Sequence, residues 1–421
     1  MTYSPLQKAL DSVGIRPSPA PTTLSGARDF IAATYRKAVD GEDIPLGEAR
    51  GRILAQDMVA PADLPRFDAS AVDGYAVTSA DLEAGPARLR IADRAAAGHP
   101  SGHRLTSGEA MRIFTGALLP KGADRVVMQE DCVRDGDWVI ARLPKRDGRH
   151  IRRKGEDVSA GSIVLRRGER LDPTHLALAS ALHFDILPVQ RRLKVTLFST
   201  GDELRAPHET IGPGQIADAN RPLLKGLLEQ LGCEVEDGGI LRDDPEAQVA
   251  KLIDAAARRD LIVTSGGASV GEEDHLSRVI RSRGSLEVWW LKIKPGKPVC
   301  LGDIDDCPIL ALPGNPVAAA LTFLMLGTPL VARLSGAAAL GPQMLRLPTQ
   351  AATVKRAGRW EAIAAHLVDQ PGEPTMVSAE KKTGSAMLGM LSHADGFIVL
   401  PEEVELVAAG DLVDFVSMPR R

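Results

Sequence analysis

Apolar strands and amphipathic helices alternate along residues 193–334. Short apolar runs rich in β-branched residues are typical of buried strands, and apolar residues at helical spacing predict helices. Gly232 stands where one helix would end, and Pro245 stands in the first turn of the next. Such alternation indicates a mainly parallel sheet with helices on both faces. The expected strands are 195–199, 235–241, 261–264, 287–293 and 309–312, and the expected helices are 220–231, 245–258, 316–333 and one from about residue 274.

Two other stretches differ from this region in composition and in the pattern of their apolar residues. From 61 to 157, prolines and glycines recur between β-type pieces, which predicts a small β domain with exposed loops. The last stretch, about 340–421, carries short β-type runs between turns and predicts a separate small β barrel or sandwich. The β-type pieces are 88–92, 111–114, 125–129 and 138–143 in the first stretch, and 397–400 and 412–416 in the last.

Helical spacing also occurs at 27–39, 46–58 and 171–182, which predicts a helical arm beside the β domain. The proline-rich residues 1–24 are an expected flexible lead-in. The expected fold is therefore multidomain, α/β plus β: a central three-layer α/β domain with a mainly parallel sheet, a small β domain with a helical arm, and a C-terminal β barrel. The expected boundaries are 1–24 for the lead-in, 25–60 and 158–190 for the arm, 61–157 for the β domain, 191–336 for the α/β domain and 337–421 for the barrel.

Composition narrows the classes of partner. A chain of 421 residues is too long for one compact core, and its net charge of −4 gives no global attraction to nucleic acid or to a membrane. Aromatic residues make up only 4%, which argues against stacking platforms for single-stranded nucleic acid. The four cysteines form no metal-type spacing, so we expect buried free thiols. No signal pattern and no bilayer-spanning apolar stretch are evident, and we expect a cytoplasmic location.

Glycine-rich and acidic segments follow four of the expected strands. Ligands of open α/β sheets bind beyond the carboxyl ends of the strands, so these segments are expected to converge at one edge. Glycines at a strand-to-helix turn offer backbone N–H groups to an anion, and clustered acids call for a cation such as Mg²⁺ beside a phosphorylated ligand. A single acid at such a place can instead be a helix N-cap. The segments are 200–203, 242–244, 265–274 and 313–316.

Three further segments mix charges in ways that a core does not need. Lys292, Lys294 and Lys297 surround a Pro-Gly turn and could balance an oxyanion or phosphate, although a solvated basic hairpin turn explains them too. Segment 67–77 holds Asp68 and Asp73 among small residues. Segment 149–157 is first basic and then acidic, a pattern that usually marks only a solvated face.

Taken together, these segments resemble the molybdopterin molybdenumtransferase family, which includes MoeA and the E domain of gephyrin. The set is specific because its members follow one another in family order, although each alone would be weak. The C-terminal stretch matches only loosely, through 383–385 and the closing β run. The matching segments are 51–55, 67–77, 112–116, 127–130, 151–158, 198–204, 242–244, 265–274, 294–298 and 312–316.

The resemblance implies an activity and an assembly. Members of the family cleave adenylylated molybdopterin, transfer molybdate to its dithiolene and release AMP, with Mg²⁺ as cofactor. The resemblance also implies an elongated homodimer, with a site between the α/β domain of one subunit and the β domain of the other. A molybdopterin adenylyltransferase is the expected supplier of the substrate.

The family's functional positions fall on named residues of this sequence. The implied catalytic residues are Asp73, Thr115, Arg152, Asp157, Glu203, Asp243, Asp274 and Lys294, of which Glu203, Asp243 and Asp274 would hold Mg²⁺. The implied substrate-binding residues are Thr200, Gly201, Ser265, Gly266, Gly267, Ser269, Gly271, Lys297, Pro313, Gly314, Asn315 and Ser385.

Three positions depart from the family pattern. Trp290 stands four residues before Lys294 where a basic residue is frequent, Ala318 replaces a common serine, and Ala364 stands where a second arginine is often found. Two other functions remain open: a non-catalytic molybdopterin carrier or scaffold of the same fold, and an unrelated α/β nucleotide-binding enzyme. The second lacks support, because neither G-x-G-x-x-G after the first strand nor a P-loop motif is present.

Overall fold

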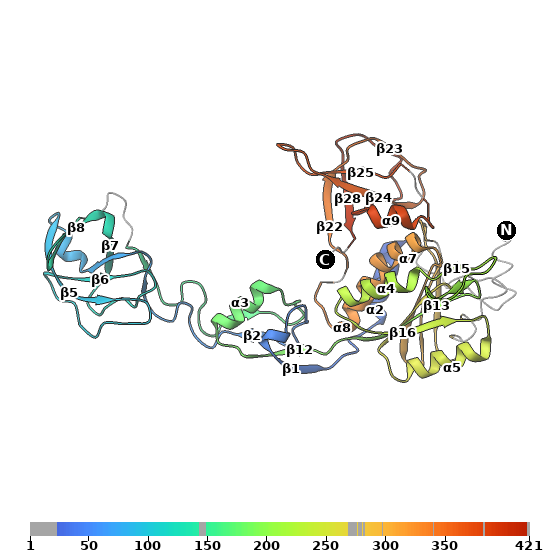
Figure 1. The fold of residues 1–421 in the computed structure, drawn as a ribbon, viewed down its shortest axis with the longest axis horizontal. Coiled ribbons are helices and arrows are strands. Elements are labelled where there is room, and N and C mark those ends of the chain that lie inside the picture. Colours follow the sequence, from blue (N-terminus) through green and yellow to red (C-terminus); the bar gives the residue numbers. More distant parts are fainter. Residues whose placement is uncertain are drawn as a thin grey trace.

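In the computed structural model the molecule is elongated (Figure 1). A β unit lies at one end, a slender arm follows, and an α/β unit with a C-terminal β unit beside it forms the other end. The structure describes residues 23–142, 149–267, 276, 280, 283–296, 298–339, 341–381 and 384–418.

The α/β unit is built on a six-stranded sheet in the order β16-β13-β17-β21-β20-β18. The first four strands are parallel, and β20 is antiparallel to both of its neighbours, β21 and β18, so the sheet is mixed. Strand β20 was not expected; it forms a hairpin with β21 through Asp305 and Asp306, which both have positive φ. The elements are β13 Lys194–Thr200, α4 Asn220–Gln230, β16 Glu234–Leu241, α5 Pro245–Ala256, β17 Leu261–Ser265, β18 Leu286–Trp290, β20 Pro298–Ile304 and β21 Cys307–Leu312, with the small pair β14 Leu204–Arg205 and β15 Ile216–Ala217.

Both faces of this sheet are covered, which gives three layers. Alternate residues of β13 point to opposite faces: Leu197 joins the core under α4, whereas Phe198 joins the core under α5. Helix α2 (Leu24–Thr34) packs against α8 (Thr328–Ser335) and contributes Ile31 to the core under α4. The segment expected to open the arm therefore belongs to the packing of the α/β unit.

Within the described ranges, one helix is long and apolar enough to cross a membrane by length and composition. It runs over Pro316–Ser335 as α7 (Pro316–Thr322), the π-helical turn η4 (Phe323–Gly327) and α8 (Thr328–Ser335). The expectation that no such stretch exists was wrong. Within the structure 94% of the segment is buried, so its apolar character comes from a position in the core.

The arm is mostly β structure, and the expected helix over 46–58 is wrong. Only a short 3₁₀ turn forms there, because Gly51 has a φ of +75° and the chain then pairs with the returning strand. The Leu54 N–H donates to the Glu169 carbonyl and the Gly51 N–H to that of Leu171. Long-range pairing thus overrides the helical spacing. The elements are β1 Gly41–Pro45, η1 Leu46–Glu48, β2 Met58–Val59, β11 Ile163–Leu165, α3 Pro173–Ala181 and β12 Ile186–Gln190.

The β unit carries a six-stranded sheet in the order β7-β4-β6-β5-β9-β8. Gly74 at the start of β4 is required by close backbone approach, since a Cβ atom there would lie 1.9 Å from the Val127 carbonyl oxygen. The expected strands of this unit agree with the structure to within a few residues. The elements are β3 Ala69–Ser70, β4 Gly74–Val77, η2 Ser79–Leu82, β5 Ala87–Ala95, β6 Glu109–Ile113, β7 Arg125–Met128, η3 Gln129–Asp131, β8 Cys132–Asp135, β9 Trp138–Ala141 and β10 Ile151–Arg152.

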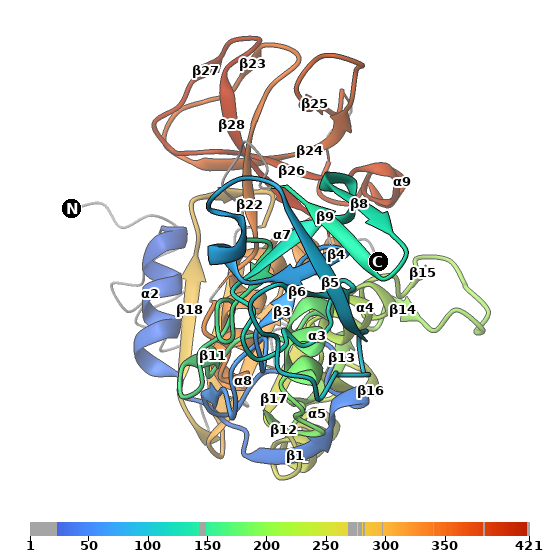
Figure 2. The same cartoon turned by 90° about the vertical axis from the view of Figure 1, so that its left-hand side faces the viewer.

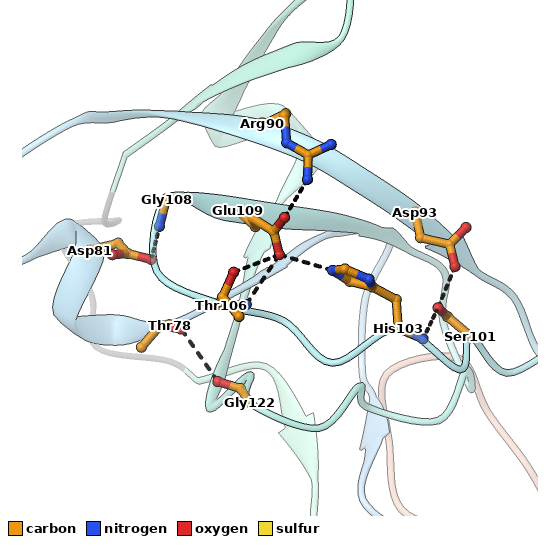
Figure 3. A network of polar contacts seen from close by, with 10 residues as sticks. All are labelled: Thr78, Asp81, Arg90, Asp93, Ser101, His103, Thr106, Gly108, Glu109 and Gly122. Carbon is orange, nitrogen blue, oxygen red and sulfur yellow. Dashed lines mark hydrogen bonds and ion pairs between the residues drawn. The ribbon is translucent and has the colours of Figure 1, made fainter.

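Glu109 ties the loop before β6 to the sheet (Figure 3). Its carboxylate accepts hydrogen bonds from the His103 ring (2.9 Å), from the Thr106 hydroxyl (2.9 Å) and from the Thr106 N–H, and it pairs with Arg90. These bonds, that from His103 first, lower the pKa of Glu109 from its ordinary 4.5 to about 2. The charged form is thus the one that holds the loop.

We expect the stability of the β unit to fall as the pH drops from about 4.5 to about 2, because protonation removes the bonds to Glu109. A depressed pKa contributes stability above the unfolded value, and that contribution disappears on acidification. Glu109→Gln should flatten this part of the profile, measured by hydrogen exchange of the β5 and β6 amides. Asp135→Asn, which breaks an exposed ion pair with Arg88, should leave the profile unchanged. An unchanged profile in Glu109→Gln would contradict the assignment.

The C-terminal unit stands beside the α/β unit (Figure 2). Its sheet runs β19-β24-β26-β28-β22 with β25 next to β24, and the Gln350 N–H, just after β22, donates to the Val377 carbonyl on β25. The sheet therefore curves until its ends meet. The elements are β19 Ile293–Lys294, β22 Met344–Pro348, β23 Thr353–Val354, β24 Trp360–Val368, β25 Met376–Ala379, α9 Leu388–His393, β26 Gly396–Leu400, β27 Leu406–Val407 and β28 Leu412–Ser417.

None of the four cysteines forms a disulfide. Cys233, Cys300 and Cys307 are buried as expected, whereas Cys132 is only half-buried. Burial raises the pKa of both Cys233 and Cys307 to about 12, so these two thiols stay protonated near neutral pH.

Candidate functional site

Three loops meet where β13, β17 and β21 end. The Gly266 N–H donates to the Leu312 carbonyl (2.9 Å), and the Thr200 hydroxyl lies 3.5 Å from the Ser265 carbonyl. Gly266 has a φ of +89°, and a Cβ atom there would lie 2.5 Å from the Thr200 hydroxyl, so only glycine fits. The described members of the expected substrate-binding set on these loops are Thr200, Gly201, Ser265, Gly266, Gly267, Pro313, Gly314 and Asn315.

Asn220 locks these loops together and was missed from the sequence. Its side-chain amide donates to the Ser265 hydroxyl (2.6 Å) and to the Gly314 carbonyl (2.5 Å), joining the ends of β17 and β21. Asn220 is 8% exposed, and its Oδ1 is buried without a hydrogen-bond partner among the described residues. From the sequence alone, an asparagine at the start of a helix indicates a helix cap. That pattern gives no sign that its side chain links two loops.

Carboxylates from two neighbouring loops reach the same edge. Glu203 folds back so that its carboxylate lies over Gly201, whose notional Cβ would be 2.3 Å from Oε2. The Asp243 N–H donates to Asp202, and Arg242 donates to the Leu204 carbonyl (2.8 Å), which fixes the two loops against each other. Both Glu203 and Asp243 are exposed.

The adjacent residue, Asp244, is a helix N-cap, which was the alternative role that the sequence left open for a single acid. Its side chain accepts from the N–H groups of Glu246 and Ala247 and so caps α5. Asp243 makes no such side-chain contact among the residues that the structure describes. Asp244 thus caps a helix, whereas Asp243 is exposed at the edge where the loops after β13, β17 and β21 meet, which we call the crevice.

The expected metal set is only partly described. Asp274 lies outside the described residues, as do Ser269, Gly271 and Lys297. No cluster of three His, Cys, Asp or Glu side chains suited to a metal occurs within the described part of the chain. Glu203 and Asp243 nevertheless suit Mg²⁺ in kind, since they are exposed oxygen donors without an ion-pair partner among the described residues, and Mg²⁺ usually keeps several waters beside one or two carboxylates.

A cavity of about 670 Å³ lies between the α/β unit and the C-terminal unit. Lys294 lines it, with its ammonium 2.7 Å from the carboxylate of Glu361, a residue only 7% exposed. Ser385 also lines it, and the Ser385 carbonyl accepts from the Val317 N–H (3.0 Å) in the first turn of α7. The cavity therefore adjoins the loop 313–316 at the edge of the sheet.

The three departures from the family pattern have different structural meanings. Trp290 ends β18 whereas Lys294 lies on β19 in another sheet, so the two residues do not share one strand face. Ala318 is buried under the turn at Gly296, whose notional Cβ would be 3.5 Å away. Ala364 lines the cavity, where Lys381 supplies a cation from another strand end.

The remaining expected residues lie in the β unit. The Thr115 N–H and hydroxyl donate to Asp73 (2.8 and 2.7 Å), and these bonds, with the Arg112 charge as a smaller cause, lower the pKa of Asp73. Arg152 is on β10, which pairs with β3 close to Gly116, and Asp157 bonds through its N–H to the Leu64 carbonyl. Asp73 and Thr115 adjoin β4 and β6. The unit that holds these strands lies at the opposite end of the molecule from the α/β unit (Figure 1). A single chain therefore keeps the two sets of residues apart.

Three family models match the chain in succession. They are the MoeA N-terminal region (domain I and II) over residues 22–182, the probable molybdopterin binding domain over 196–333, and the MoeA C-terminal region (domain IV) over 346–418.

Individual relatives match over nearly their whole length. A molybdopterin molybdenumtransferase of Haemophilus influenzae is 38% identical over 401 residues, covering 93% of this chain and 97% of the relative. A molybdopterin molybdenumtransferase 2 of Mycobacterium tuberculosis is 36% identical over 392 residues, covering 90% and 96%. A crystal structure of the molybdopterin biosynthesis moeA protein of Pyrococcus horikoshii has a TM-score of 0.81 at 29% identity, covering 94% of this chain and all of the other.

Proposed function

The chain belongs to the molybdopterin molybdenumtransferase (MoeA) family and is an enzyme of molybdenum cofactor biosynthesis, and we propose that it cleaves adenylylated molybdopterin with Mg²⁺ and transfers molybdate to the dithiolene, releasing AMP. The observation that carries the proposal is the meeting of three strand-end loops beside a cavity that Lys294 and Ser385 line. Backbone N–H groups that suit an anion thus adjoin a cavity that contains two lysine side chains, as a phosphorylated pterin and molybdate require.

In the crevice the backbone of 265–267 and 313–315 would bind the pterin and its phosphate. Asn220 would keep these loops at the separation that the ligand needs, because it bonds to both. Holding the substrate in one orientation lowers the entropic part of the barrier, and no nucleophilic side chain is required for this role.

Glu203 and Asp243, with Asp274, would hold Mg²⁺ at the same edge. When bound, the ion supplies positive charge to the phosphate oxygens as AMP departs. The exposed carboxylates would orient its water ligands, while Arg242 keeps their two loops together.

The cavity would take molybdate. Lys294 keeps two ammonium hydrogens beyond its bond to Glu361, and Ser385 and Lys381 line the same space. Lys381 would supply a positive charge there, since Ala364 stands where family members often carry an arginine. We regard the curved C-terminal sheet as the expected barrel, whose wall completes the cavity.

We also propose that the enzyme works as a cytoplasmic homodimer that receives its substrate from a molybdopterin adenylyltransferase, without nucleic-acid or membrane partners. The support for the dimer is the separation of Asp73 and Thr115 from the crevice along one elongated chain. A second subunit in the opposite direction would bring its β unit to the first subunit's crevice, giving two equivalent sites.

Purified protein mixed with adenylylated molybdopterin, molybdate and Mg²⁺ is expected to release AMP, and omission of either molybdate or Mg²⁺ should stop the release. Release that needs neither would contradict the coupled reaction. Tight pterin binding without release would instead indicate the non-catalytic carrier of the same fold.

A further inference from the structure

Two arginines of the β unit meet over one aromatic ring. Arg94 on β5 and Arg112 on β6 are direct cross-strand partners. Their guanidinium carbons lie 4.7 Å and 4.5 Å from the centroid of the half-buried Phe114 ring. Like charges placed opposite each other destabilise a sheet, and stacking on the ring offsets only part of that repulsion.

Neither arginine has a carboxylate partner within ion-pair distance among the residues that the structure describes. Arg112 donates to two neutral oxygens, the Gly74 carbonyl (3.0 Å) and the Gln129 side chain (2.7 Å). The other two arginines of these strands are paired: Arg88 with Asp135, and Arg90 with Glu109 (Figure 3). On these two strands, Arg88 and Arg90 thus each have a carboxylate partner, whereas Arg94 and Arg112 share the Phe114 ring instead.

The two arginines, Arg94 and Arg112, lie beside two of the implied catalytic residues. Thr115 follows Phe114 directly and donates to Asp73, and the next residue, Gly74, accepts from Arg112. Anything held by the two guanidinium groups therefore lies next to the Asp73–Thr115 pair.

We propose that Arg94 and Arg112 form an anion site that binds a phosphate group of the adenylylated substrate when this β unit closes the crevice of the partner subunit. The inference rests on the proposed function, which it extends by two substrate-binding residues. Guanidinium groups suit phosphate because each presents several donors in a plane, and a phosphoanhydride offers oxygens to both. Phe114 holds the groups side by side before the ligand arrives, which lowers the entropy lost on binding.

The test compares two stacked arginines of one strand. Arg94 is exposed and stacks on Phe114, while Arg88 stacks at 4.6 Å on Trp138, so Arg88→Gln is a matched control for Arg94→Gln. In Arg94→Gln we expect the KM for adenylylated molybdopterin and the Ki of inorganic pyrophosphate to rise about tenfold, with kcat and the KM for molybdate unchanged. Arg94→Lys should recover part of the loss, and Arg88→Gln should behave as wild type.

If Arg94→Gln and Arg88→Gln have the same KM for adenylylated molybdopterin and the same Ki for pyrophosphate, while the wild type releases AMP normally, the anion site is wrong and the proposed function stands. A rise in the KM for molybdate instead would overturn its assignment to phosphate. If the wild-type protein releases no AMP, the proposed function itself is wrong. Calorimetric binding of pyrophosphate then decides the anion site by itself: weaker binding to Arg94→Gln than to Arg88→Gln supports it, and equal binding overturns it.

Discussion

A mixed dimer of Asp73→Asn and Asp243→Asn chains is expected to release AMP although neither variant does so alone. Asp73 directly precedes β4 of the β unit, and Asp243 lies just before α5 of the α/β unit. These two units lie at opposite ends of the molecule (Figure 1). If each site takes its β unit from one subunit and its crevice from the other, one site of the mixed dimer carries both substitutions. The other site carries neither and should give about half of the wild-type activity.

The measurement uses co-expressed chains with two different tags and purification on both. Asp73→Asn paired with Thr115→Ala is the matched control, because both changes fall on the same unit and each site keeps one of them. That dimer should stay inactive. An inactive Asp73→Asn/Asp243→Asn dimer, with both chains folded, would mean that each site is built within one chain, which the distance between the two units makes difficult.

The strands of the α/β unit could be predicted because the local apolar pattern there favours the same structure as burial in the sheet does. The runs at 195–199 and 261–264 are apolar on both sides and become buried parallel strands, β13 and β17. Their carboxyl ends must then share an edge, so the meeting of Thr200 with Ser265 follows from topology.

The errors arose where long-range contacts decide the local structure. Residues 46–58 have helical spacing, yet only a 3₁₀ turn forms at 46–48, because the chain from 51 to 54 pairs with 169–171. Helix α2 lies next to the arm in sequence but is held by the core through Ile31. Asn220 is indistinguishable from a cap until β17 and the loop after β21 are placed on either side of it. No local pattern encodes such neighbours, because each depends on the position of a distant segment.

Replacing Asp243 by asparagine is expected to lower Mg²⁺-dependent AMP release at least about 100-fold, whereas Asp244→Asn should leave it unchanged. The two residues are adjacent and chemically identical, but only Asp244 has its carboxylate bound to the N-terminus of α5. Asparagine caps a helix about as well as aspartate, so Asp244→Asn keeps both fold and activity. Asparagine at 243 keeps the shape and loses the charge that a divalent cation needs.

A titration of AMP release against Mg²⁺ separates two explanations of a loss at Asp243. If the carboxylate holds the ion, Asp243→Asn should need a higher Mg²⁺ concentration and recover part of its rate, with unfolding unchanged. Asp244→Ala provides the contrast, since losing the cap should cost about 1 kcal/mol of stability without altering the Mg²⁺ requirement. Equal Mg²⁺ dependence in wild type and Asp243→Asn would exclude Asp243 as a ligand. The charge at the crevice would then act on the substrate directly.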